Sequence, residues 1–357
     1  MIDRAAVRRR DVLRGAGAAG LLLCDTPLFA GGPHLAAGSD FGEKFALCLG
    51  QAMAPLAANA LALAEVQRLD ARADALLRQI GMNDGTVPER LTACFGDQRY
   101  LYPDSDAGRD RAVADMNDTL ARARPRVAAA FKGISLPHAE VRRMSPDDLA
   151  KGKAGYRDIS ISDAPSAYYV DLRNIRNRPR WTLPSVAFHE LIPGHCLQLA
   201  LPAAHRRALL PLRNAPAFFE AWGLYAEWLM CELGFYADDR LGELGFIHWR
   251  LFRMARVVVD IGLHTQGWSR GRAILEMRAI QGPDIAFTTI EADIDKMSAN
   301  PAIYAAHAVG AIQLARMYVN GQKTGNTDFH PALLHGAILL DKPWPYWLML
   351  DVVSHAP

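Results

Sequence analysis

The segment SVAFHELIPGHCLQL, from Ser185 to Leu199, holds the residues from which the fold and chemistry of this chain are predicted. His189 and Glu190 are adjacent, and His195 lies six residues after His189. Helical zinc sites of the H-E-x-x-H type place two histidines four residues apart, on one face of a helix. Six residues at about 100° each leave a mismatch of about 120°. A regular helix would therefore keep the two histidines apart.

Pro193 and Gly194 supply a break that changes this expectation. A proline inside a helix removes one hydrogen bond and clashes with the carbonyl four residues earlier, which is that of His189. The neighbouring glycine tolerates the backbone angles of a local bulge. If these two residues bulge, His195 returns to the face of His189, and the segment predicts a zinc site on an interrupted helix. The alternative is a core helix with a proline kink and two incidental histidines.

A second segment, FFEAWGLYAEW from Phe218 to Trp228, offers a third ligand. Its two glutamates, Glu220 and Glu227, are seven residues apart and share one face of a helix. Carboxylates on such an apolar helix are costly unless they have partners. Glu220 follows His195 by 25 residues, a distance that suits an antiparallel second helix. We therefore expect His189, His195 and Glu220 to bind Zn²⁺; the alternative is two glutamates that face solvent.

The rest of the chain predicts a mainly α fold with a small β element just ahead of the zinc-binding helix. Apolar residues recur at helical spacing over 41–80, with a break at Pro55, and again over 107–132. Short β-favouring runs occupy 141–144, 158–162 and 167–172, and helical patterns return after 184. The predicted organisation is a signal segment over 1–30, an N-terminal helical region over 31–132 and a catalytic zinc-peptidase-like domain over 133–357.

The N-terminus predicts export. Arg8, Arg9 and Arg10 precede a weakly apolar run over 15–23, the pattern of a twin-arginine signal. This run is too short and too rich in glycine to be a stable transmembrane span. We expect a bacterial protein of the periplasm or the extracellular space; the alternative is the basic start of a core helix. With a net charge of +2 and interspersed acids and bases, nothing favours a nucleic-acid partner.

The motifs HELIPGHCLQ and EAWGLYAE together resemble the bacterial family known as domain of unknown function 885. That family is regarded as a gluzincin-like group of metallocarboxypeptidases, and the likeness runs from about residue 167 to the end. The resemblance implies that His189, His195 and Glu220 are ligands and that Glu190 is the catalytic acid/base. This chain departs from the family at Ala221, where glycine is usual, at His307, where tyrosine is usual, and in its shorter N-terminal part.

Further site residues are hypotheses at this stage. His264 lies in a segment that the resemblance covers, and we expect it, ahead of His307 and Tyr304, to stabilise the oxyanion; each could instead be a core side chain. Arg316 could bind a substrate carboxylate, although a surface arginine is the alternative. Tyr169 is expected on an edge strand against which an extended peptide pairs. The histidines in HRR and HWR, His205 and His248, are expected on helix surfaces.

The predicted function is zinc-dependent hydrolysis of peptide bonds, of carboxypeptidase or dipeptidase type, with Glu190 activating the attacking water. The substrate would be a peptide. The alternative is a non-catalytic or non-peptidase relative that binds peptides or hydrolyses another amide or ester. The sequence leaves open the preferred chain end, the native metal and the oligomeric state, a homo-oligomer included.

Overall fold

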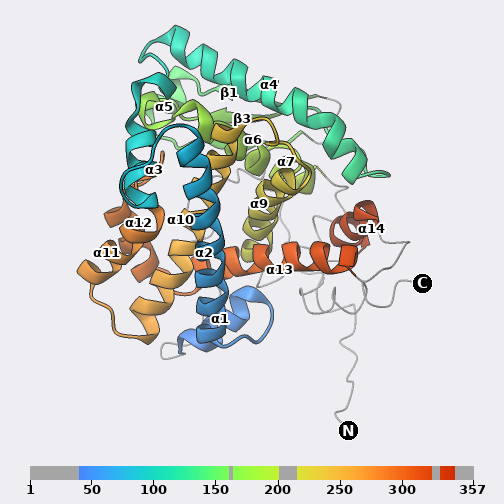
Figure 1. Ribbon diagram of the computed structural model, residues 1–357. Coiled ribbons are helices and arrows are strands. Elements are labelled where there is room, and N and C mark those ends of the chain that lie inside the picture. The colour runs from blue at the N-terminus through green and yellow to red at the C-terminus, as the bar shows by residue number, and fades with distance from the viewer. Residues whose placement is uncertain (1–39, 161–163, 201–214, 324–329, 342–357) are drawn as a thin grey trace.

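A computed structural model describes residues 40–160, 164–200, 215–323 and 330–341 (Figure 1). The predicted signal segment over 1–30 lies outside the described residues. Helices dominate the described chain and accompany one three-stranded sheet, so the predicted mainly α fold is confirmed. Across these residues, no helix combines the length and apolar character needed to cross a membrane.

The N-terminal part forms four helices, α1 (Phe41–Leu49), α2 (Pro55–Gln79), α3 (Val87–Gly96) and α4 (Asp106–Ala130). The predicted break at Pro55 is confirmed, because α1 ends at Gly50 in the left-handed conformation (φ 78°) and Pro55 is the first residue of α2. Thr86 begins α3 with a reciprocal capping box to Glu89. A short 3₁₀ helix, η2 (Gln98–Tyr100), leads into α4.

The small sheet has the strand order β1–β3–β2, with β1 at Ala139–Arg143, β2 at Tyr156–Asp158 and β3 at Ser166–Val170. The helix α5 (Pro146–Ala150) lies between β1 and β2 in sequence. Strand β3 pairs parallel with β1 and antiparallel with β2. The predicted β element ahead of the helix that carries His189 is therefore present. The edge position predicted for Tyr169 is wrong, because β3 is the central strand and has no free edge for a peptide.

The C-terminal part is again helical. After the 3₁₀ helices η3 (Ile175–Asn177) and η4 (Arg180–Thr182), its elements are α6 (Leu183–Glu190), α7 (His195–Leu199), α9 (Ala215–Glu232), α10 (Arg240–Thr265), α11 (Arg270–Gln281), α12 (Ile290–Ala299), α13 (Ile303–Lys323), α14 (Pro331–Gly336) and a π-helical turn (Ala337–Asp341).

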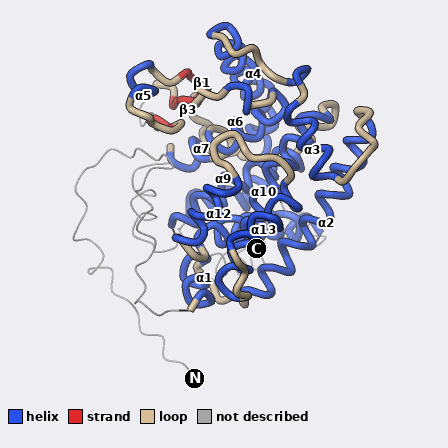
Figure 2. Tube along the Cα trace, turned by 90° about the vertical axis from the view of Figure 1, so that its left-hand side faces the viewer, coloured by secondary structure: helices blue, strands red, loops and turns tan. Residues whose placement is uncertain are grey.

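The helices pack around one continuous hydrophobic core. Helix α2 lies along α10, α13 crosses α9, and α6 contacts both α9 and α10 (Figure 1). Buried side chains from α1 to α4 and from the C-terminal helices belong to the same cluster, so the core continues across the boundary predicted near residue 132. Figure 2 shows the sheet at one edge of the helical body, near α6 and α7. This arrangement places β2 within reach of the histidine segment.

Candidate metal centre

The helix that carries the histidines is interrupted where the sequence predicts it. Helix α6 ends at Glu190 and α7 begins at His195, and the Ile192–Pro193 peptide between them is cis. Gly194 packs directly on α6, because a Cβ added there would lie 2.0 Å from the carbonyl oxygen of His189. Trp222 Nε1 on α9 donates to the carbonyl oxygens of Pro193 at 2.9 Å and Gly194 at 3.2 Å. These contacts hold the short loop against α9.

This break brings together the three predicted ligands. The Nε2 atoms of His189 and His195 are 3.1 Å apart. Glu220 Oε2 is 3.7 Å from His189 Nε2, and Glu220 Oε1 is 3.5 Å from His195 Nε2. A tetrahedral ion with ligand distances near 2.0–2.1 Å requires ligand atoms about 3.3 Å apart. The observed spacing fits such an ion, and both histidines are buried.

A second layer of hydrogen bonds fixes the orientation of the two imidazoles. Glu227 Oε1 lies 2.8 Å from His189 Nδ1, and Ser185 Oγ donates to Glu227 Oε2 at 2.5 Å. Gln198 Oε1 lies 3.4 Å from His195 Nδ1. Because a carboxylate and an amide oxygen only accept, both Nδ1 atoms carry the hydrogen in the neutral rings. Each Nε2 then presents a lone pair toward the other ring.

Two Nε2 atoms 3.1 Å apart, with a carboxylate beside them, favour a proton or a metal ion between them. The pKa shifts of His189 and Glu220 also indicate that this point attracts positive charge. Burial alone would lower the pKa of His189, but hydrogen bonds to Glu220 and Glu227 raise it to about 9. Burial would raise the pKa of Glu220, yet the contacts with His189 and His195 hold it well below its usual range. The site thus favours positive charge at the point where a metal would bind.

Helix α9 approaches the His189 ring closely at Gly223. A Cβ added to Gly223 would lie 2.7 to 2.9 Å from three atoms of that imidazole. Real Cβ contacts are essentially never so short, so an alanine would displace the ring or separate α6 from α9. The glycine in AWGLY is therefore part of the site, one turn beyond Glu220 on the same helix.

Glu190 points into the same region and pairs with Arg157 on β2. Both side chains are largely buried. Burial would raise the pKa of Glu190, but the Arg157 guanidinium, followed by His189, lowers it. Glu190 is thus held as a carboxylate. Arg157 was not predicted from the sequence, because its partner is 33 residues away and only the packing of the sheet on α6 brings the two together.

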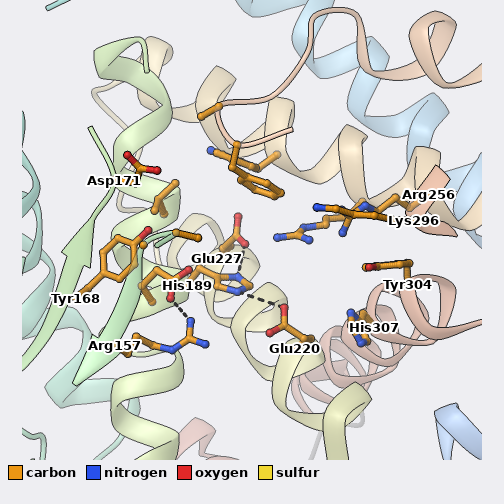
Figure 3. A pocket seen from close by; sticks show the side chains of 18 of the residues that line it. Arg157, Tyr168, Asp171, His189, Glu220, Glu227, Arg256, Lys296, Tyr304 and His307 are labelled. Carbon is orange, nitrogen blue, oxygen red and sulfur yellow. Dashed lines mark hydrogen bonds and ion pairs between the residues drawn. The ribbon is translucent and has the colours of Figure 1, made fainter. Parts of the chain in front are cut away.

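The site opens into a cavity of about 680 Å³ (Figure 3). His189, Glu190, Glu220 and Glu227 form one part of its wall. Figure 3 shows Arg157 and Tyr168 on one side of these residues, with Tyr304, His307, Arg256 and Lys296 on the other. Three of the four predicted catalytic residues therefore line the cavity: Glu190 from α6, and Tyr304 and His307 from α13. Burial lowers the pKa of His307 to about 4, so its imidazole is neutral.

Three other predicted site residues are not brought to the cavity. His264 stacks on Phe41, with ring centroids 5.7 Å apart, and its Nε2 lies 3.2 Å from the carbonyl oxygen of Met297. Arg316 is exposed on α13. The ring of Tyr169 stacks on that of Tyr156, with ring centroids 4.6 Å apart. Among the described residues that line the cavity, none of the three appears, so the structure does not support their predicted roles.

Comparisons with known proteins place the chain in a family. Residues 34–341 match the family described as bacterial protein of unknown function DUF885. No curated protein matches the sequence. A predicted lipoprotein of Colwellia psychrerythraea has a similar structure, with a TM-score of 0.77 and 27% identity, over 88% of this chain and 54% of that chain.

A second solved structure, a predicted lipoprotein of unknown function from Shewanella oneidensis, shares the fold with a TM-score of 0.68 at 14% identity. This match covers 88% of the present chain and 59% of the other. The chain therefore spans little more than half the length of either relative. Since the family match extends over most of its residues, this protein belongs to the bacterial family of unknown function DUF885.

Proposed function

We propose that this protein is a zinc-dependent hydrolase of peptide bonds. The observation that carries the proposal is the pair of buried imidazole Nε2 atoms, 3.1 Å apart, that converge with the Glu220 carboxylate on one point. Two histidines and a glutamate are a ligand set typical of catalytic zinc, which keeps a further position for water or substrate. When bound, zinc supplies Lewis-acid polarisation and makes water nucleophilic near neutral pH.

The roles of the protein's own residues follow from their positions. Glu190 presents a carboxylate beside the ligand cluster, and it can take the proton of the attacking water and return it to the leaving amine. Arg157 orients Glu190 through their ion pair. Tyr304 and His307 lie across the cavity, where a hydroxyl or a ring N–H can donate to the oxygen of the scissile carbonyl as charge develops on it.

The cavity of about 680 Å³ has the volume of a site for a small ligand, so we infer that short peptides are the substrates and that the activity is of carboxypeptidase or dipeptidase type. We also infer export from two observations. The sequence begins with a twin-arginine pattern, and two structural relatives are described as lipoproteins, a class that functions outside the cytoplasm. An exported hydrolase of this kind would act on peptides in the periplasm or beyond.

The first test is the metal content and peptidase activity of purified protein. We expect about one zinc per chain by elemental analysis in the wild type and in Glu190→Gln, and little in Glu220→Ala. A peptide library followed by mass spectrometry should show cleavage by the wild type only. Zinc binding without cleavage would instead favour a peptide-binding relative or a hydrolase of another amide or ester. Absence of zinc from the wild type would contradict the proposal.

A further inference from the structure

The cavity beside the metal centre carries more positive than negative side chains. The cations that line it are Arg157, Arg173, Arg178, Arg253, Arg256 and Lys296. The acids that line it are Asp171, Glu190, Glu220 and Glu227. A bound divalent metal would add further positive charge. A cation that forms no ion pair with one of these acids is available to bind an anionic ligand.

All four acids already have partners. Glu190 pairs with Arg157, and Asp171 is held by Arg173, whose Nη2 lies 2.6 Å from Asp171 Oδ2. Glu220 faces the two histidines, and Glu227 binds His189 Nδ1 at 2.8 Å. A fifth acid outside the lining, Asp293, binds Arg256 through both carboxylate oxygens, at 2.5 and 2.8 Å.

Arg178 remains without a counter-ion. It lies between η3 and η4 and is only 7% exposed. Its side chain forms no hydrogen bond or ion pair with any residue in the described part of the chain. Burial would raise the pKa of Asp171, but the hydrogen bonds and charge of Arg173 lower it, and the charge of Arg178 lowers it by a smaller amount. The Asp171 carboxylate itself is occupied by Arg173. The residue as a whole is nine-tenths buried and lines the cavity, so an anion in the cavity would offset the cost of holding its charge there.

We infer that Arg178 binds a carboxylate of the substrate within the cavity, an inference that rests on the proposed peptidase function. A guanidinium presents a planar pair of N–H donors that matches a carboxylate through two parallel hydrogen bonds. Lys296 on α12 lines the same cavity, and its ammonium forms no ion pair within the described ranges, so it adds to the positive potential. The substrate class is a short peptide with a carboxylate beyond the scissile bond.

The neighbouring wall can accept an apolar side chain of such a peptide. Val186, Trp249 and Phe287 line the cavity, and the rings of Trp249 and Phe287 stack with centroids 5.9 Å apart. Phe287 is 43% exposed, which leaves part of its surface open to a ligand. The carboxylate itself can come from the C-terminus of the peptide or from an acidic side chain. The chemistry at Arg178 is the same for both sources, and the experiment separates them.

The test compares zinc-loaded wild type with Arg178→Gln, Arg178→Lys and the control Arg316→Gln, which changes an exposed arginine outside the cavity. Four peptides are used: a tripeptide with neutral side chains, its C-terminal amide, and amides with Glu or Gln at the centre. Arg178→Gln should lower kcat/KM about 10- to 100-fold for the carboxylate-bearing peptides, mainly through KM. The neutral amides should be affected little, and Arg178→Lys should recover part of the loss.

Binding gives a second, independent measurement. Calorimetric titration of zinc-loaded Glu190→Gln should show the same preference for carboxylate-bearing peptides, and adding Arg178→Gln should remove it. Equal turnover and affinity for acids and amides would overturn the inference while the peptidase proposal stands. Arg178-dependent binding without hydrolysis by the wild type would support the inference and overturn the peptidase proposal. A loss of the same size in Arg316→Gln would also contradict the role of Arg178.

Discussion

Single side chains around the ligands set the properties of the proposed metal site. Glu227 is the clearest case, because it is buried, accepts from His189 Nδ1 at 2.8 Å and is itself held by Ser185. Such a carboxylate fixes the ring orientation and increases the basicity of the ligating nitrogen. The sequence showed Glu227 on the same helix face as Glu220 but not its partner, since Ser185 and His189 lie about 40 residues earlier.

Replacing Glu227 with alanine should weaken zinc binding about 10- to 100-fold, the usual loss for an outer hydrogen-bond partner of a ligand. Competition with a fluorescent zinc chelator would measure the affinity. Glu232→Ala, an exposed glutamate at the end of the same helix, serves as the control and should leave the affinity unchanged. Equal affinities in wild type and Glu227→Ala would argue against the assigned contact.

His248 shows where residue-level prediction was wrong. It was expected on a helix surface, but it is fully buried against the rings of Phe95, Trp181 and Trp249. Neither ring nitrogen finds a hydrogen-bond partner among the described residues. Arg250, the charged residue of HWR, is buried as well, because helix α10 is covered on nearly every side. Periodicity within one helix does not show how many neighbours surround it.

Burial lowers the pKa of His248 from 6.5 to about 4. The folded state therefore binds fewer protons than the unfolded state between these values. The contribution of His248 to stability is complete above pH 6.5 and is lost as the pH falls toward 4. Between pH 7 and pH 5 the loss should be about 2 kcal/mol. His248→Phe should remove that part of the pH dependence, as measured by denaturant unfolding at both values; identical slopes would contradict the assignment.

At the scale of elements, the site depends on the close contact of α6 with α9. The interruption at Pro193 and Gly194 could be predicted, because proline and glycine have strong backbone preferences. The contact of Gly223 with the His189 ring could not, since it depends on the distance between two helix axes. The predicted edge position of Tyr169 failed for a similar reason: strand propensity does not reveal strand order.

Gly223→Ala should disturb this contact, because its Cβ would lie within 2.9 Å of the imidazole. We expect at least a tenfold loss of zinc affinity and a lower melting temperature, measured on the same preparation. Gly271→Ala in α11 is the matched control, since its Cβ would meet nothing within 4 Å and alanine favours a helix. Unchanged zinc affinity in Gly223→Ala would show that α6 and α9 can separate without cost.

At the scale of the whole molecule, helical periodicity predicted most of the helices, and short β-favouring runs predicted the small β element. It did not predict that the core would continue from α2 to α10 across the boundary near residue 132. The sequence also did not identify Arg157, and it could not single out Arg178 among the arginines that precede the motif, because both roles depend on a cavity shared by the sheet, α6, α10, α12 and α13. A cavity forms between packed elements, so the balance of charged residues that line it cannot be read from the sequence.

The ligands come from α6, α7 and α9, so a bound metal should stabilise the folded protein. A ligand at about 1,000 times its dissociation constant contributes about 4 kcal/mol. Removing zinc with a chelator should therefore lower the melting temperature by several degrees, on the order of 5 °C. Differential scanning calorimetry would measure the change, and Glu220→Ala should show none. A chelator-insensitive wild type would speak against a metal that bridges these helices.

The ion pair between Arg157 and Glu190 also bears on how small a working fragment of this protein can be. The two histidines and the three glutamates of the helical motifs lie after residue 183, which invites the design of a compact, all-helical fragment. Arg157 comes from β2, however, and β2 pairs with β3 in the sheet. A fragment that begins at α6 would retain the proposed ligands but would lack Arg157, the ion-pair partner that orients Glu190. Any minimised or transplanted version must therefore carry the sheet along with the helices.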